Sequence, residues 1–171
     1  MSKRDQIIKA AEQRAREGGY NNFSFRELAK EIGIKSASVH YYFPTKEDLG
    51  VELARQYTEA FLAKLGEPET KEDPIAVYIN AFRSALVVDK KMCLCGLFGA
   101  ESEILPESVQ RQTRLFFEAN IAWLIKAFKY KENLDEAMAK RKSIQLLALL
   151  EGAMILGKSM NSIDIFDCTL E

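Results

Sequence analysis

Apolar residues recur along most of this chain at steps of three and four, a spacing that gathers them on one face of an α-helix. Near the start, Ile7, Ala11 and Ala15 follow the spacing, while Lys9 and Glu12 fall on the opposite face. No stretch alternates apolar and polar residues in the manner of a half-buried strand. The pattern therefore predicts an all-α fold.

Residues that cap or break helices divide this pattern into separate elements. Gly18 and Gly19 are expected to end the first helix, because glycine readily adopts the left-handed conformation of a helix C-terminus. Thr45 is a candidate N-cap, and Pro74 and Pro106 suit first turns, where a missing N–H costs nothing. The predicted helices cover residues 2–16, 25–32, 36–42, 46–65, 74–89, 96–104, 106–129, 135–159 and 164–170.

The segment from residue 24 to residue 43 has the features of a helix-turn-helix motif. Ser24 and Glu27 have the Ser-x-x-Glu spacing of a capping box, which satisfies two backbone donors at the start of a helix. Ala29, Gly33 and Val39 stand at the offsets that the motif requires: a small residue where the helices approach, a glycine at the turn, and a β-branched residue that packs between the helices. These features predict two short helices joined by a tight turn.

The second helix of this motif is predicted to present a face that contacts DNA. Ser36 is expected to cap the helix, with Val39 and Phe43 directed inward. Small residues at its start fit a major groove, and the hydroxyl and imidazole groups that follow suit phosphate oxygens, as do flanking positive charges. The residues predicted on this chemistry to contact DNA are Arg26, Lys35, Ser36, Ala37, Ser38, His40, Tyr41, Tyr42 and Lys46. In the alternative interpretation, the aromatic residues 40–43 merely close a small helical core.

Composition adds weaker evidence. The net charge is −1, and the first 50 residues hold nine Lys and Arg against seven Asp and Glu, a slight positive bias. The most apolar stretch, residues 144–157, is interrupted by Glu151 and is shorter than the roughly 20 residues that span a bilayer. No signal peptide follows Met1, and three cysteines argue against a disulfide framework, so we expect a cytoplasmic protein without membrane contact.

The run from Phe23 to Leu49, FSFRELAKEIGIKSASVHYYFPTKEDL, resembles the TetR family of bacterial regulators, most specifically in its YYFxxKxxL ending. By this resemblance, Ser24, Phe25 and Arg26 lie where the family's second helix meets phosphates. The resemblance also assigns the DNA-contacting residues between 36 and 42 to the family's recognition helix, and Lys46 to a backbone contact at the start of the fourth helix. His40 stands where the family usually has tyrosine, and Tyr42 where it usually has histidine.

The resemblance further implies a homodimer, usually a repressor that a small molecule releases from DNA. We expect a helix-turn-helix DNA-binding domain over residues 1–47 and a helical ligand-binding and dimerisation domain over 48–171. The predicted partners are a palindromic double-stranded DNA operator, a second copy of the chain and a small effector. With no phosphate-binding glycine loop, no second histidine and no evident carboxylate pair, we expect neither an enzyme nor a bound cofactor or metal. The alternative function is a helical interaction or scaffold module that does not bind DNA.

Two features of the second domain are candidates for sensing a signal. Cys93 and Cys95 follow two lysines, which could lower a thiol pKa and create a sensor of oxidants or electrophiles. The alternative is that both thiols are small buried apolar groups, as free cysteines usually are. The residues that either line an apolar effector cavity or simply fill the core are Phe82, Leu86, Phe98, Phe116 and Trp123.

The helix predicted at residues 135–159 is apolar on nearly all sides, so several neighbours must cover it. In a chain of this size, that favours a partner helix from a second copy; the alternative is a monomeric core filled by the same residues. We expect this helix and the one at 106–129 to form a four-helix dimer core. The residues assigned to the interface are Ile144, Leu147, Leu150, Met154 and Ile155.

Overall fold

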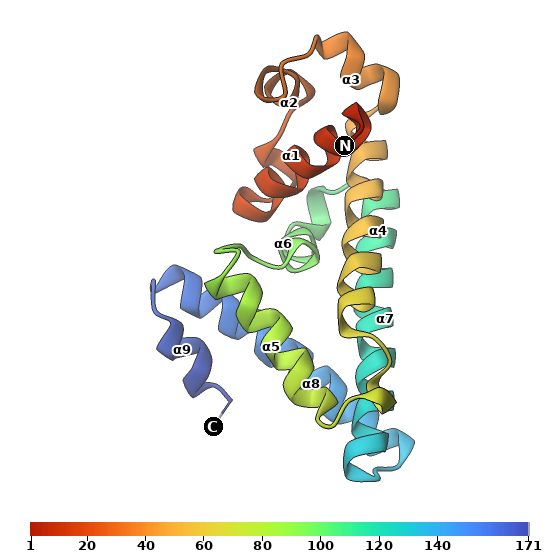
Figure 1. The fold of residues 1–171 in the computed structure, drawn as a ribbon, viewed down its shortest axis with the longest axis vertical. Helices are drawn as coiled ribbons and strands as arrows, with labels where there is room; N and C mark the ends of the chain where they lie inside the picture. The colour runs from red at the N-terminus through yellow and green to blue at the C-terminus, as the bar shows by residue number, and fades with distance from the viewer. Residues whose placement is uncertain (171) are drawn as a thin grey trace. The chain divides into compact units, whose positions relative to one another are not determined.

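The computed structural model describes residues 1–170, which form nine α-helices and three short 3-10 turns and contain no strand. The all-α prediction is therefore confirmed over this part of the chain. The helices, labelled as in Figure 1, are α1 Lys3–Gly18, α2 Phe25–Glu31, α3 Ser36–Tyr42, α4 Lys46–Leu65, α5 Pro74–Val87, α6 Leu94–Ala100, α7 Glu107–Glu132, α8 Glu136–Ser159 and α9 Ile163–Cys168.

The helices divide into two compact units. The N-terminal unit comprises Met1–Thr58 and Leu94–Phe116, and the C-terminal unit comprises Glu59–Cys93 together with the chain from Phe117 onward. Each of α4 and α7 therefore contributes residues to both units. The domain boundary expected after residue 47 stays a prediction, while the internal contacts group the first part of α4 and all of α6 with the N-terminal helices.

In the N-terminal unit, α1 begins and ends at residues that the sequence marks. The Ser2 hydroxyl accepts the Asp5 backbone N–H at 3.1 Å, and the Asp5 carboxylate accepts the Ser2 N–H at 2.9 Å, so both donors are satisfied. The helix ends at Gly19, whose φ of +80° favours a residue without a Cβ. The core that α1, α2 and α3 share, each side chain at most 3% exposed, consists of Ile7, Ala11, Leu28, Val39 and Phe43.

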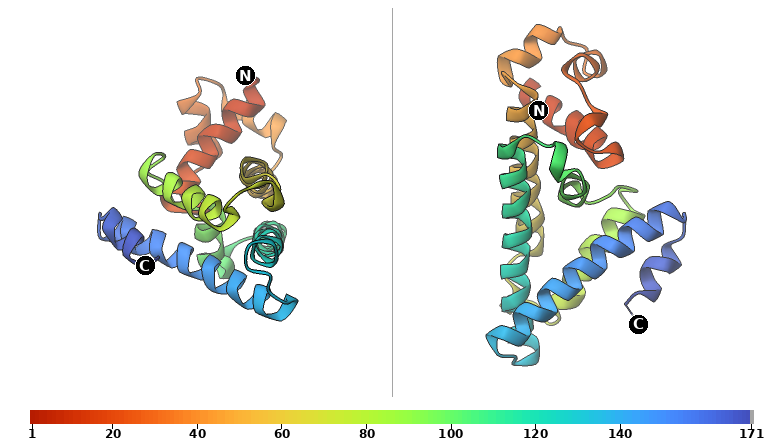
Figure 2. Two further views of the ribbon diagram at one scale, coloured as in Figure 1. Left: turned by 60° about the horizontal axis from the view of Figure 1, so that its bottom comes forward. Right: turned by 180° about the vertical axis from the view of Figure 1, so that it is seen from behind.

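In the C-terminal unit, α5 packs against α8, and α9 turns back along the end of α8 (Figure 2). Asp73 caps α5 by accepting the Ala76 N–H at 3.0 Å, and Asp135 caps α8 by accepting the Met138 N–H at 2.8 Å. Burial of large apolar side chains supplies most of the driving force for this packing. The largest of them are Tyr78, Phe82, Leu147, Leu150, Met154 and Phe166.

Several helix ends differ from the predicted ones, most of them by one or two residues, and α6 and α7 differ most. The helix expected at 96–104 begins at Leu94 and stops at Ala100, and Ser102–Ile104 forms a 3-10 turn. Between them, Glu101 leaves the helical conformation, at φ −99° and ψ 14°, while its carboxylate accepts a hydrogen bond from Tyr20. A contact with a residue distant in sequence therefore accompanies the end of this helix. In addition, α7 begins one residue after Pro106 and continues three residues beyond the predicted end.

Candidate nucleic-acid interface

α2, the turn after it and α3 form the helix-turn-helix that the sequence predicts. The Ser24 hydroxyl accepts the Glu27 backbone N–H at 3.3 Å and donates to the Glu27 carboxylate at 2.7 Å. The carboxylate thus binds the Ser24 hydroxyl, where the sequence predicted that it would bind a backbone N–H. At the turn, Gly33 has a φ of +68°, and the Ile34 N–H donates to the Ala29 carbonyl at 2.9 Å. The turn therefore needs the conformation that glycine adopts most easily.

α3 is held in place by its inward side chains, with Val39 fully buried and Phe43 3% exposed. Its N-cap is Lys35, which makes no side-chain capping bond, so the prediction that Ser36 caps the helix is wrong. The reason is that the backbone stays extended through Lys35, at φ −78° and ψ 146°, and turns helical only at Ser36. Ser36 therefore lies inside the first turn of α3, at the leading edge of the proposed recognition face.

The outward face of α3 is open over the residues expected to contact DNA. Tyr41 is 81% exposed, and its ring meets the ring of Tyr42 edge-on at 5.2 Å. Among the aromatic residues 40–43, only Phe43 is buried, so the run does not serve chiefly to close the core. The other predicted contacts divide into an exposed group, Arg26, Lys35, Ala37 and His40, and a half-buried group, Ser24, Ser36, Ser38, Tyr42 and Lys46.

His40 is exposed, yet its orientation is set by two neighbours. Its ring lies nearly perpendicular to the Phe25 ring, with the centroids 4.7 Å apart. Its Nδ1 is 3.3 Å from the Pro44 carbonyl oxygen, which can only accept, so Nδ1 carries the proton in this hydrogen bond. In a neutral imidazole, Nε2 is then an acceptor. His40 therefore offers an oriented ring at the position where the family usually has tyrosine.

Two of the predicted DNA contacts also serve the fold. Phe25 is 9% exposed, so its ring belongs to the core and only its backbone can face a phosphate. The Lys46 ammonium lies 4.5 Å from the centre of the Tyr20 ring and 4.8 Å from that of Phe23, within cation–π range. Burial lowers the pKa of Lys46.

Glu101 is a residue of the N-terminal unit that no sequence motif indicates. Its carboxylate accepts the Tyr20 backbone N–H at 2.7 Å. The carboxylate fits against Gly19, where an added Cβ would stand 2.1 Å from one of its oxygens. Beside it, Phe98 of α6 meets the Tyr20 ring edge-on at 5.8 Å. These contacts hold the α6 segment against the turn that follows α1. No local sequence pattern connects the residues that make them.

The aromatic residues considered for an effector cavity are divided between the two units. Phe98 and Phe116 are fully buried in the N-terminal unit, and Phe116 packs on Tyr57 with ring centres 5.6 Å apart. Phe82 and Trp123 belong to the C-terminal unit, where both pack against the Tyr78 ring, at 5.4 and 5.5 Å. The described contacts of these four rings are those of core residues.

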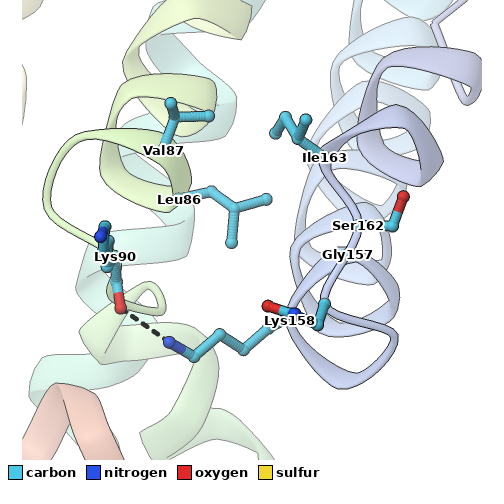
Figure 3. A pocket seen from close by; sticks show the side chains of 8 residues that line it. Leu86, Val87, Lys90, Gly157, Lys158, Ser162 and Ile163 are labelled. Carbon is cyan, nitrogen blue, oxygen red and sulfur yellow. Dashed lines mark hydrogen bonds between the residues drawn. The ribbon is translucent and has the colours of Figure 1, made fainter.

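Leu86 lines a cavity of about 280 Å³ between the end of α5 and the junction of α8 and α9 (Figure 3). Across one edge of the cavity, the Lys158 ammonium donates to the Lys90 carbonyl at 2.8 Å. Gly157 forms part of the wall, where an added Cβ would lie 3.1 Å from a Leu86 methyl carbon. Its volume lies slightly below about 300 Å³, the lower end of the range for typical small-molecule sites.

Cys93 and Cys95 are 2% and 0% exposed, and neither forms a disulfide bond. The Cys93 thiol donates a hydrogen bond to the carboxylate of Glu151. Reactive thiols usually lie partly exposed in positively charged surroundings, whereas these two are buried and Cys93 faces a carboxylate. The structure therefore favours the interpretation in which both thiols are small buried groups, and it does not support a sensor activated by the neighbouring lysines.

The residues assigned to a dimer interface lie on two different faces of α8. Leu147, Leu150 and Met154 are at most 5% exposed, so they fill the core of their own chain, and their assignment to the interface is corrected. The reason is that this stripe of α8 packs inside the C-terminal unit, in which α8 contacts α5. Ile144 and Ile155 are 45% and 52% exposed and remain candidates for an interface.

The described part of the chain bears on two further classes of site. None of the helices within residues 1–170 combines the length and the apolar character that crossing a membrane requires. Across the same residues, no three His, Cys, Asp or Glu side chains are grouped so that they could hold a metal ion.

Residues 7–53 match the sequence profile of the bacterial regulatory proteins of the tetR family. A TetR transcriptional regulator from Legionella pneumophila, known from its crystal structure, is 30% identical, and the match covers 99% of this chain and 94% of that one with a TM-score of 0.93. The fatty acid metabolism regulator protein of Bacillus subtilis is 28% identical over 93 residues, which are 52% of this chain and 48% of the relative. The HTH-type transcriptional regulator TcmR of Streptomyces glaucescens is 25% identical over 143 residues, 84% of this chain and 62% of the relative. The chain thus spans less than two thirds of the length of these two curated relatives.

Proposed function

This chain belongs to the TetR family of bacterial regulatory proteins, and we propose that it is a transcriptional regulator that inserts α3 into the major groove of duplex DNA. The observation that carries the proposal is the open face of α3, on which Tyr41 is 81% exposed while Val39 is fully buried beneath it. A short helix anchored on one side and bare on the other can enter a groove without rearrangement of the fold.

Different residues on and beside this face suit contacts with bases and contacts with phosphates. Ala37 and Ser38, at the start of α3, are small enough for base edges and thymine methyl groups to approach. The Tyr41 hydroxyl and the charges of Lys35 and Arg26 suit phosphate oxygens, which position a protein on the duplex without reading its sequence. Base contacts from the first turn of α3 would then supply the specificity.

The protein is proposed to act as a homodimer on a palindromic operator, because a two-fold protein matches a two-fold site. The support within this chain is a second face of α8, where Leu149 and Ile155 are 41% and 52% exposed. Between them, a Cβ added to Gly152 would meet no heavy atom within 4 Å apart from its chain neighbours and the backbone of α8 itself. That open space beside exposed apolar side chains would allow a helix of a second copy to pack closely.

Release from DNA is proposed to follow the binding of a small effector in the C-terminal unit, which makes the protein a repressor. α4 and α7 contribute residues to both units and are therefore the elements through which a change in one unit can alter the other. Successive major grooves on one side of a duplex are about 34 Å apart, so a change in the spacing of the two recognition helices weakens binding. An enzymatic role is not proposed, because the relatives are named as regulators.

The test begins with selection of a bound sequence from random duplexes, followed by fluorescence anisotropy of that duplex at several salt concentrations. The variant replaces Lys35 and Tyr41 with alanine, since both are exposed and their replacement should leave the fold intact. The control is Tyr130→Ala in α7, because Tyr130 is likewise 53% exposed but far along the chain from α3.

The wild type and the control should bind tightly and lose affinity steeply with salt, because phosphate contacts release counterions. The double variant should bind more weakly, with a logarithmic salt slope shallower by about one for each phosphate group that it no longer binds. A wild type without salt-dependent DNA affinity would instead support the alternative of a helical scaffold module. Equal affinities of the double variant and the control would refute the role of α3.

A further inference from the structure

Four polar side chains meet inside the C-terminal unit among large apolar groups. They are Tyr78 of α5, Cys93 before α6, Asn120 of α7 and Glu151 of α8. Tyr78 and Asn120 are fully buried, and Cys93 is 2% exposed. Tyr78 donates to the Asn120 side-chain oxygen at 2.7 Å, and Cys93 donates to the Glu151 carboxylate. The two hydrogen-bonded pairs are neighbours, because burial raises the pKa of Tyr78 and the nearby Cys93 and Glu151 raise it further.

Within residues 1–170, Oε1 of Glu151 is buried and has no hydrogen-bond partner. The Tyr78 hydroxyl cannot supply one, because its single proton is directed at Asn120. The Cys93 thiol also has a single proton, which its bond to the same carboxylate uses. A buried acceptor without a donor is costly, and native proteins rarely keep one without a reason. Oε1 of Glu151 therefore requires a hydrogen-bond donor from outside the four-residue cluster.

The electrostatic surroundings indicate which kind of donor is missing. Burial raises the pKa of Glu151 to about 7, and the Cys93 hydrogen bond is the only interaction among the described residues that opposes the rise. No neighbouring cation within that part of the chain therefore balances this carboxylate when it is ionised. Next to the cluster, the Tyr78 ring stacks on Trp123 with centroids 5.5 Å apart and lies 5.4 Å from Phe82. Aromatic faces attract cations, and they attract them more strongly when water is excluded.

We propose that Glu151 is the recognition group for an effector that is an organic cation, a protonated amine carried on an apolar or aromatic body. The ammonium N–H donates to the open oxygen of Glu151, and its charge balances the carboxylate. The inference rests on the proposed effector-controlled regulator and names the chemical class of that effector. Carboxylic acids are excluded, because a second negative charge beside Glu151 would be repelled.

The experiment measures ligand binding to the full chain without DNA, by isothermal titration calorimetry at pH 8. The probes are phenylalkyl amines with one to six methylene groups, each paired with the alcohol and the carboxylic acid of the same length. The variants are Glu151→Gln, which keeps the shape and removes the charge, and Glu118→Gln, a matched control on the exposed surface of α7.

The wild type and the Glu118→Gln control should bind at least one amine on the order of tenfold to a hundredfold more tightly than its alcohol, the range expected of a charge-assisted hydrogen bond. Glu151→Gln should abolish that difference, and no acid should bind better than its alcohol. The proposal is overturned if no amine binds the wild type more tightly than its alcohol, or if Glu151→Gln keeps the preference.

The same proteins are then tested for release of the selected duplex by the preferred amine. Salt-dependent DNA binding combined with no preference for amines sinks this inference and leaves the proposed regulator intact. A preference for amines that depends on Glu151, in a protein without DNA affinity, supports the cation site and refutes the regulator.

Discussion

Replacing Glu151 with glutamine should stabilise the protein, and by an amount that depends on pH. The pKa of Glu151 is raised by burial from 4.5 to about 7. A group whose folded pKa lies above its unfolded value favours folding when protonated, so this stabilisation is complete below pH 4.5 and is lost as the pH rises to about 7. Glutamine resembles the protonated acid in shape and does not titrate, so the variant should escape this loss.

The magnitude follows from the shift. Each pKa unit corresponds to about 1.4 kcal/mol, so ionisation of the buried carboxylate costs the wild type about 3 kcal/mol at pH 8 and about 1 kcal/mol or less at pH 5. For a chain of this size, a gain of about 3 kcal/mol raises the melting temperature by roughly 6 to 12 °C. Glu151→Gln should therefore melt well above the wild type at pH 8 and close to it at pH 5.

Thermal and urea unfolding, followed by circular dichroism at equal protein concentrations, measure this difference. Glu118→Gln serves as the control, because the Glu118 side chain is exposed and its replacement should change stability little at either pH. An equal effect of Glu151→Gln at pH 5 and pH 8 would refute the reasoning. So would a loss of stability at pH 8, since it would mean that the ionised carboxylate has a partner in the fold.

Three further substitutions test other parts of the structure. Gly19→Ala should destabilise the protein by at least about 2 kcal/mol in urea unfolding, because φ is +80° and the new Cβ would press on the Glu101 carboxylate. Surface substitutions usually change the free energy of unfolding by less than about 0.5 kcal/mol, so a loss below that value would contradict this contact. Tyr78→Phe should cost about 1 to 3 kcal/mol, because it removes the buried hydrogen bond that the Tyr78 hydroxyl donates to the Asn120 oxygen, and unchanged urea stability would contradict that bond. If the protein forms the proposed dimer, Gly152→Phe should raise the monomer fraction in sedimentation velocity, because the ring would fill the space in which a second copy is proposed to pack. An unchanged monomer fraction would refute an interface at Gly152.

Local signals carried most of what could be predicted about secondary structure and the helix-turn-helix. Glycine at position 33 and the buried Val39 were predictable because a tight turn and a close helix crossing restrict which residues fit at fixed spacing. The exposure of Tyr41 followed from the same helical period. These features depend on neighbours within a few positions, so the sequence alone contains them.

Positions that depend on distant partners could not be predicted. The apolar pattern of Leu147, Leu150 and Met154 on α8 is the same whether these residues pack in their own chain or against a second copy. Only the tertiary packing shows that they lie in the core of their own chain. The end of α6 at Ala100 coincides with the bond from Tyr20 to Glu101, which spans 81 positions.

The sequence by itself determined where the helices form and which of them carries the exposed face proposed to contact DNA, because periodicity, caps and turn residues act over short distances. The tertiary structure alone decided which apolar faces are covered and which polar groups are buried. Glu151 lies in an apolar helix in the sequence, but its raised pKa and its open oxygen arise only when the surrounding core excludes water from the carboxylate.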